Sequence, residues 1–146
     1  MKKLLKSCSI CFIIVVMIST TAFAAAPSDL AAPQSNSYIA KTTVAVGTPG
    51  NGVIEVACSI TPTGVMEKVG IRKIEFYRAD GTFLESHRYT DPGYEYLMGY
   101  NTFKHNAVVQ FQGVAKESYY AIVYFYASKG NGSGGYQMGS SVVVAK

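Results

Sequence analysis

Short runs in which apolar and polar residues alternate recur along the chain between clusters of turn-forming residues. The clearest run is 53–61, where one face carries Ile54, Val56, Cys58 and Ile60. A period of two residues is typical of β-strands with one buried face. Residues 25–146 contain 13 Val, 11 Tyr and 8 Thr but only three Leu, a composition that favours strands over helices. No sustained 3.6-residue apolar repeat is present, so the sequence predicts an all-β fold.

The turn signals divide residues 38–146 into strands. Asp80-Gly81 predicts a two-residue hairpin turn. A change of apolar phase between Ile71 and Ile74 predicts a bulge at Arg72–Lys73. Seven or eight strands in about 110 residues predict a single immunoglobulin-like antiparallel β-sandwich. The expected strands are 38–46, 53–61, 69–78, 82–89, 106–114, 118–127 and 138–146, with 94–100 as a short strand or ordered loop, 47–52 as a turn and 129–135 as a flexible loop.

The first 24 residues have the pattern of a cleaved signal peptide. A basic start, Met1–Lys6, precedes the uninterrupted apolar run Ile10–Ile18, and Ala22-Phe23-Ala24 follows as a small-x-small cleavage site. The apolar run is too short for a membrane span, which needs about 20 residues. We therefore expect a signal peptide at 1–24, a flexible leader at 25–37 and a sandwich domain at 38–146. The product is then secreted through a Sec-type pathway, with no membrane span left after cleavage.

The charge balance argues against a nucleic-acid partner. Three of the 13 basic residues lie in residues 1–24, and the remainder carries ten Lys and Arg against nine Asp and Glu. Binding to phosphates needs a basic patch on the folded domain. Most of the net positive charge of the chain lies in the predicted signal peptide. We therefore expect no nucleic-acid binding by the domain.

Catalytic and metal-binding patterns are weak. Cys58 remains alone after signal cleavage, so no internal disulfide forms, and its place on an apolar strand face predicts a buried, unreactive thiol. A pair of Cys58 as nucleophile and His105 as base is the less favoured alternative. The carboxylates are scattered, and the histidines, His87 and His105, are too few for a zinc site. We expect no catalytic set, no metal and no cofactor.

The tyrosines are the most informative feature. Along 119–127 one face carries Tyr119, Ala121, Val123, Phe125 and Ala127, and the other carries Tyr120, Ile122, Tyr124 and Tyr126. The first set has the small and fully apolar members, so we assign it to the core. The second set then faces outward with its hydroxyls in solvent, beside Tyr77 and a stripe of Tyr94, Tyr96 and Tyr100. The candidate ligand-binding residues are Tyr120, Tyr124, Tyr126 and Tyr77.

Two interpretations of this outward tyrosine row stay open. Tyrosine supplies rigid contact area for binding, and exposed aromatic rows stack on sugar rings or contact proteins. Cross-strand aromatic pairs also simply stabilise a sheet.

Two passages carry a family resemblance. The run I-E-F-Y-R-A-D-G-T-F-L at 74–84 resembles the central C-to-C′ hairpin of bacterial immunoglobulin-like and fibronectin-type-III-like domains. The run S-Y-Y-A-I-V-Y-F-Y-A at 118–127 is similar to their F strand, with Tyr119 or Tyr120 where a tyrosine corner would lie. With the signal peptide, the chain resembles small secreted proteins of Gram-positive bacteria. The resemblance implies a shape and no activity.

The sequence therefore predicts a secreted, non-enzymatic β-sandwich that acts through surface contacts at or outside the cell envelope. Its partner would be a cell-wall polysaccharide or another extracellular protein. The alternatives are a small exported enzyme such as a cell-wall hydrolase, and an exported toxin or bacteriocin-like polypeptide.

Overall fold

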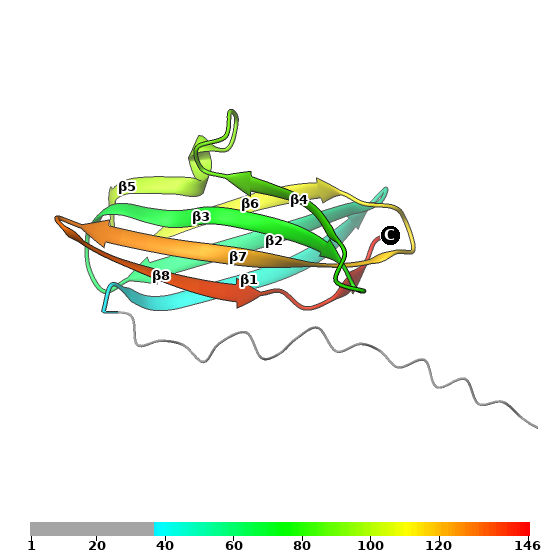
Figure 1. The fold of residues 1–146 in the computed structure, drawn as a ribbon, viewed down its shortest axis with the longest axis horizontal. Helices are drawn as coiled ribbons and strands as arrows, with labels where there is room; N and C mark the ends of the chain where they lie inside the picture. The colour runs from blue at the N-terminus through cyan, green and yellow to red at the C-terminus, as the bar shows by residue number, and fades with distance from the viewer. Residues whose placement is uncertain (1–36) are drawn as a thin grey trace, which may run out of the picture.

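The computed structural model describes residues 37–146, which form an antiparallel all-β domain (Figure 1). The predicted signal peptide and all of the predicted leader except Ser37 lie outside the described residues. A single turn of 3-10 helix, η1 (Glu95–Leu97), interrupts the strands. The strands are β1 (Ile39–Gly50), β2 (Val53–Pro62), β3 (Met66–Arg78), β4 (Phe83–Arg88), β5 (Met98–Thr102), β6 (His105–Gln112), β7 (Ser118–Lys129), β8 (Gly132–Gly139) and β9 (Val143–Val144).

The strands form two sheets packed face to face, which confirms the predicted sandwich. One sheet has the order β1-β2-β6, and the other has β4-β3-β7-β8 along its main path. The long strands β3 and β7 lie at the centre of the second sheet (Figure 1). β4 and β5 pair with successive parts of one edge of β3, and β8 and β9 do the same along β7. The chain returns to the first sheet at β6 and to the second sheet at β7, so the two sheets are linked by crossing connections.

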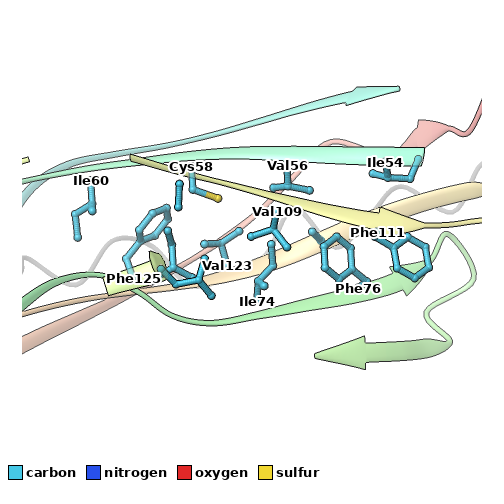
Figure 2. Packing of buried hydrophobic residues seen from close by; sticks show 14 of the residues in the cluster. Ile54, Val56, Cys58, Ile60, Ile74, Phe76, Val109, Phe111, Val123 and Phe125 are labelled. Carbon is cyan, nitrogen blue, oxygen red and sulfur yellow. The ribbon is translucent and has the colours of Figure 1, made fainter. Parts of the chain in front are cut away.

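The core lies between the two sheets and follows the alternation in the sequence. Every second residue of β2 is buried, and the side chain of Cys58 points into the same layer as Val56 and Ile60 (Figure 2). Phe76 of one sheet stacks on Phe111 of the other, with ring centroids 5.0 Å apart. Burial of each large aliphatic or aromatic side chain stabilises a fold by about 1.5–3 kcal/mol, so this layer is the main source of stability.

A bulge in β3 sets which residues face outward on the second sheet. The pairing of β3 with β7 shifts between Ile71 and Lys73, as the sequence predicts. The extra residue, Arg72, lets both Ile71 and Ile74 point into the core although they are three residues apart. Beyond the bulge, Lys73, Glu75 and Tyr77 alternate with the buried Ile74 and Phe76 and lie on the outer side.

Two of the expected turns differ from the structure. The β3–β4 loop has three residues, because the amide of Gly81 donates to the Arg78 carbonyl (2.9 Å) and that of Arg78 donates to the Thr82 carbonyl (2.9 Å). The segment 129–135 is not a flexible loop: Lys129 pairs with Gly132 across a two-residue turn, and β8 begins there. Residues rich in Gly and Ser form this strand because the long β7 offers a pairing edge, which overrides their low strand propensity.

The boundaries of the first and last strands also differ from the expected ones. β1 continues through most of the expected turn to Gly50, and only Asn51-Gly52 connects it to β2, with φ angles of 53° and 78°. Positive φ at both positions is typical of the type I′ hairpin turn. The expected last strand, 138–146, is split, because β8 ends at Gly139 and β9 covers two residues. The ninth strand arises because β8 occupies most of the expected loop 129–135.

Tyr119 forms a tyrosine corner at the start of β7. Its hydroxyl accepts a hydrogen bond from the amide of Val114, five residues upstream (2.8 Å), and donates to Glu117 (2.9 Å). The ring is only 2% exposed and lies against Gly113, where a side chain would collide with it. Of the two tyrosines that the resemblance offers, the corner is therefore Tyr119.

Candidate functional site: the tyrosine face

The outer side of β7 carries the predicted tyrosine row. Tyr119, Ala121, Val123, Phe125 and Ala127 belong to the core between the sheets. Tyr120, Ile122, Tyr124 and Tyr126 point the other way, as the alternation predicts. They are not equally accessible: Tyr120 is 7% exposed and Ile122 is 9% exposed, whereas Tyr124 and Tyr126 are partly exposed. We call this outer surface of β3 and β7 the tyrosine face, comprising Lys73, Glu75, Tyr77, Tyr120, Ile122, Tyr124 and Tyr126.

The register of β3 against β7 places Tyr77 directly opposite Tyr120. Their rings stack with centroids 5.2 Å apart and planes 10° from parallel. Phe83 of β4, which is 53% exposed, meets Tyr77 edge-on at 5.6 Å. Phe83, Tyr77 and Tyr120 thus form an aromatic ladder across three strands. This part of the tyrosine face fits the sheet-stabilising interpretation, because each ring covers its neighbour.

Glu75 is the centre of a hydrogen-bond network in the middle of the tyrosine face. Its Oε2 accepts hydrogen bonds from the hydroxyls of Tyr124 (2.8 Å) and Tyr77 (3.0 Å), and its Oε1 pairs with Lys73 Nζ (2.7 Å). Lys73 Nζ also lies 4.2 Å from the centroid of the Tyr124 ring, within the range of a cation–π contact. The expectation that the hydroxyls of the outward tyrosines point into solvent is therefore wrong for Tyr124.

The network fixes the charge state of its members at neutral pH. Partial burial alone would raise the pKa of Glu75, but the hydrogen bonds from Lys73, Tyr124 and Tyr77 outweigh it, so the pKa lies below its usual value. Burial, followed by the hydrogen bond to Glu75, raises the pKa of Tyr124 to about 12. The same two causes raise the pKa of Tyr77. The site therefore holds one carboxylate and two neutral phenols, with their rings fixed in position.

Tyr126 is held differently from Tyr124. Its neighbours across β7 are glycines on both sides, Gly70 of β3 and Gly135 of β8. Within residues 37–146 the Tyr126 hydroxyl forms no hydrogen bond, and the ring stacks on no other ring. Gly135 has no side chain to cover the Tyr126 ring, whereas the backbone of Leu97 and Met98 lies where a side chain at Gly70 would be. Tyr126 extends the tyrosine face beyond Tyr124 without being tied into its network.

Tyr94, Tyr96 and Tyr100 do not join the hydrogen-bond network of Glu75, and each has partners of its own. Tyr94 stacks on His87 with ring centroids 4.1 Å apart, and the hydroxyl of Tyr96 donates to the Val108 carbonyl of β6 (3.2 Å), in the other sheet. Tyr100 lies on β5, opposite Lys68 of β3. The sequence alone places these tyrosines near one another but does not show that Tyr94 stacks on β4 and Tyr96 bonds to the other sheet.

The alternative pair of Cys58 and His105 has no support in the geometry. Burial raises the pKa of the Cys58 thiol to about 12, which keeps it protonated. His105 directs Nε2 to the Tyr96 carbonyl at 2.9 Å. Among the residues from Ser37 onward, no group of three or more His, Cys, Asp or Glu side chains is arranged to hold a metal ion. In the same part of the chain, no helix has the length and apolar character to cross a membrane.

Sequence reasoning missed Lys73 and Glu75 as members of the site. Carboxylates that alternate with apolar residues usually form a solvated face, and the position of Glu75 in the sequence fits that pattern. The signal that could have found it is the alternation of Glu75 and Tyr77 with Ile74 and Phe76, which puts both on the outer side of β3. Pairing that strand with 118–127 then places both beside the outward tyrosines.

Comparison with known proteins gives no relative: no family model, no curated protein and no solved structure matches the chain.

Proposed function

We propose that this protein is exported and acts without catalysis, by binding a glycan of the cell envelope through its tyrosine face. The basic start, apolar run and cleavage site of residues 1–24 support export. The observation that carries the binding proposal is the outward position of Tyr124 and Tyr126, on the side of β7 opposite the core.

The chemistry of the tyrosine face suits a sugar better than a large protein interface. A sugar ring presents a small apolar face with polar groups at its edge, and an aromatic ring with nearby hydrogen-bonding groups matches both. Tyr124 offers such a combination, because its ring is partly exposed and Glu75 and Lys73 lie beside it. A stable protein interface needs about 800 Å² on each partner with well-exposed aromatic anchors. Tyr120 cannot be such an anchor, since it is almost fully buried under Tyr77.

Binding of purified exported protein to isolated cell wall, with variants of single tyrosines, tests this proposal. Tyr126→Ser removes a ring without breaking a hydrogen bond, so we expect weaker binding with little change in melting temperature. Aromatic contacts contribute on the order of 1 kcal/mol each, which corresponds to several-fold weaker binding per ring. Tyr124→Ser should weaken binding as well but also lower stability, because it removes a partner of Glu75.

Tyr96→Ser is the matched control, since Tyr96 is 47% exposed and contacts β6 of the other sheet. Equal effects of Tyr96→Ser and Tyr126→Ser would contradict a site on the tyrosine face. Saturable capture of an extracellular protein together with no affinity for cell wall would replace the glycan by a protein partner. Release of soluble wall fragments by the wild-type protein would instead favour an enzyme.

A further inference from the structure

A shallow pocket of about 350 Å³ lies next to the tyrosine face, where β3 bulges and β4 ends. Its walls are formed by Arg72, Lys73, Arg88, Tyr89 and Thr90. Lys73 lies opposite Arg88 in the pairing of β3 with β4, so the two side chains are on the same side of the sheet. The amide of Tyr89 donates to the carbonyl of Arg72 (3.4 Å), which ties the end of β4 to the bulge.

The positive charge of this pocket is only partly balanced. Glu75 pairs with Lys73, but neither Arg72 nor Arg88 forms an ion pair with any carboxylate of residues 37–146. The carboxylate of Asp91 accepts a hydrogen bond from the backbone amide of Arg88 (2.7 Å) rather than from its side chain. Arg78 on the same strand, in contrast, pairs with Glu117 at 3.2 Å.

The pocket and the tyrosine face share one row of residues across the sheet. Arg88, Lys73 and Tyr124 follow one another on β4, β3 and β7. Neighbouring strands lie about 4.8 Å apart, so the row from Arg88 to Tyr124 spans about 10 Å. Lys73 belongs to both sites, because it lines the pocket and contacts the Tyr124 ring. A chain of two or three sugars lying along this row would reach from the ring to the arginines.

We infer that the glycan bound by the tyrosine face is acidic, and that the pocket of Arg72 and Arg88 holds its anionic group. The inference rests on the proposed function and specifies its ligand. Guanidinium groups bind carboxylate and phosphate through two parallel hydrogen bonds, so the group is the carboxylate of a uronic acid or the phosphate of a glycosylated polyol-phosphate chain. The sugar next to that group lies on Tyr124 and Tyr126.

Affinities for polygalacturonate, for its fully methyl-esterified form and for poly(glycerol phosphate) that carries glucosyl substituents test this inference. The esterified polymer has the same sugar rings without the charges. We expect the wild-type protein to bind at least one anionic polymer more tightly than the esterified one, with affinity that falls as salt rises. Preference between the two anionic polymers distinguishes carboxylate from phosphate. Arg72→Gln and Arg88→Gln should each weaken anionic binding about tenfold, while leaving affinity for the esterified polymer unchanged.

Arg78→Gln is the matched control, because it removes the same charge from β3 at a site outside the pocket. Equal loss of anionic binding in Arg78→Gln and Arg88→Gln would overturn the assignment of the pocket. Equal wild-type affinity for esterified and unesterified polymer would overturn the acidic ligand, while Tyr126→Ser still reports whether the tyrosine face binds sugar. If no polymer and no cell wall is bound, the proposed function itself fails.

Discussion

Cys58 illustrates how a single residue reports on the core. It lies on β2 with 3% of its surface exposed, among aliphatic side chains of both sheets. Burial raises its pKa to about 12, so almost no thiolate exists at neutral pH. The residue therefore acts as a small apolar side chain.

We predict that Cys58 reacts slowly with thiol reagents in the native protein and rapidly after unfolding. Cys58→Ala should lower the free energy of unfolding by about 1 kcal/mol, because it removes packing but no hydrogen bond. Labelling followed by mass spectrometry, with and without denaturant, measures the first effect, and chemical denaturation measures the second. Rapid labelling of the folded protein would show that the thiol is accessible and would make a nucleophilic role worth testing.

Glu75 links residue-scale electrostatics to stability. Its folded-state pKa is lower than that of an ordinary glutamate, so its contribution to stability is present above the unfolded-state pKa of about 4.3. That contribution is lost as the pH falls through the lower folded-state value. We predict that Glu75→Gln lowers the melting temperature at pH 7 and that the difference from wild type shrinks below about pH 4.

Thermal unfolding of both proteins over this pH range measures the effect. Glu55→Gln is a suitable control, because Glu55 lies on β2 and its Oε2 accepts a hydrogen bond only from Gln110 (3.1 Å) among the described residues. A Glu75→Gln difference that is independent of pH would show that the carboxylate charge does not contribute.

At the scale of elements, the start of β7 is fixed by the tyrosine corner. The Tyr119 hydroxyl connects the chain before β7 to the strand itself, and its partner Glu117 pairs with Arg78 at the end of β3. A hydrogen bond of this kind contributes about 0.5–1.5 kcal/mol, and more where a polar group is left unpaired.

We predict that Tyr119→Phe lowers the free energy of unfolding by about 1–2 kcal/mol, since the Val114 amide loses its partner while the ring still fills the core. Chemical denaturation provides the measurement. Tyr136→Phe is the comparison, because Tyr136 of β8 is also packed against the core but lies outside the corner. If both variants lose the same small amount, the corner is not a special source of stability.

Strands and bulges could be predicted where they depend on the pattern of apolar and polar residues within a short stretch of sequence. The alternation of β2, the bulge in β3 and the two faces of β7 follow from residues close together in the sequence. β8 was missed, because its glycines and serines resemble a loop and only the edge of β7 makes them a strand. The two-residue signal Asp80-Gly81 gave the right hairpin but one loop residue too few, because Gly81 is used as the last loop residue before Thr82.

At the scale of the whole molecule, the outward tyrosines were predictable and their partners were not. Alternation alone places Tyr124 on the outer side of β7. The bond from Tyr124 to Glu75 depends instead on the register of β3 against β7, which joins residues 49 positions apart. No local pattern encodes that register. For the same reason, the burial of Tyr120 beneath Tyr77 could not be foreseen from 118–127.

The proposed export concerns the whole chain, because it determines where the exported protein begins. We predict that the protein found outside the cell begins at or near Ala25, because Ala22-Phe23-Ala24 has the pattern of a cleavage site. Intact-mass measurement of culture supernatant gives the N-terminus directly. Detection of a mass that includes residues 1–24 would contradict signal cleavage.

The most direct test of the central claim is an NMR titration of the tyrosine-labelled protein with solubilised cell-wall glycan. If the tyrosine face binds the glycan, the ring signals of Tyr124 and Tyr126 shift in a saturable manner. The signals of Tyr119, which is in the core, and Tyr96, which contacts the other sheet, stay in place. Shifts confined to Tyr96 and Tyr100, or no shift of any tyrosine at saturating glycan, would contradict the account.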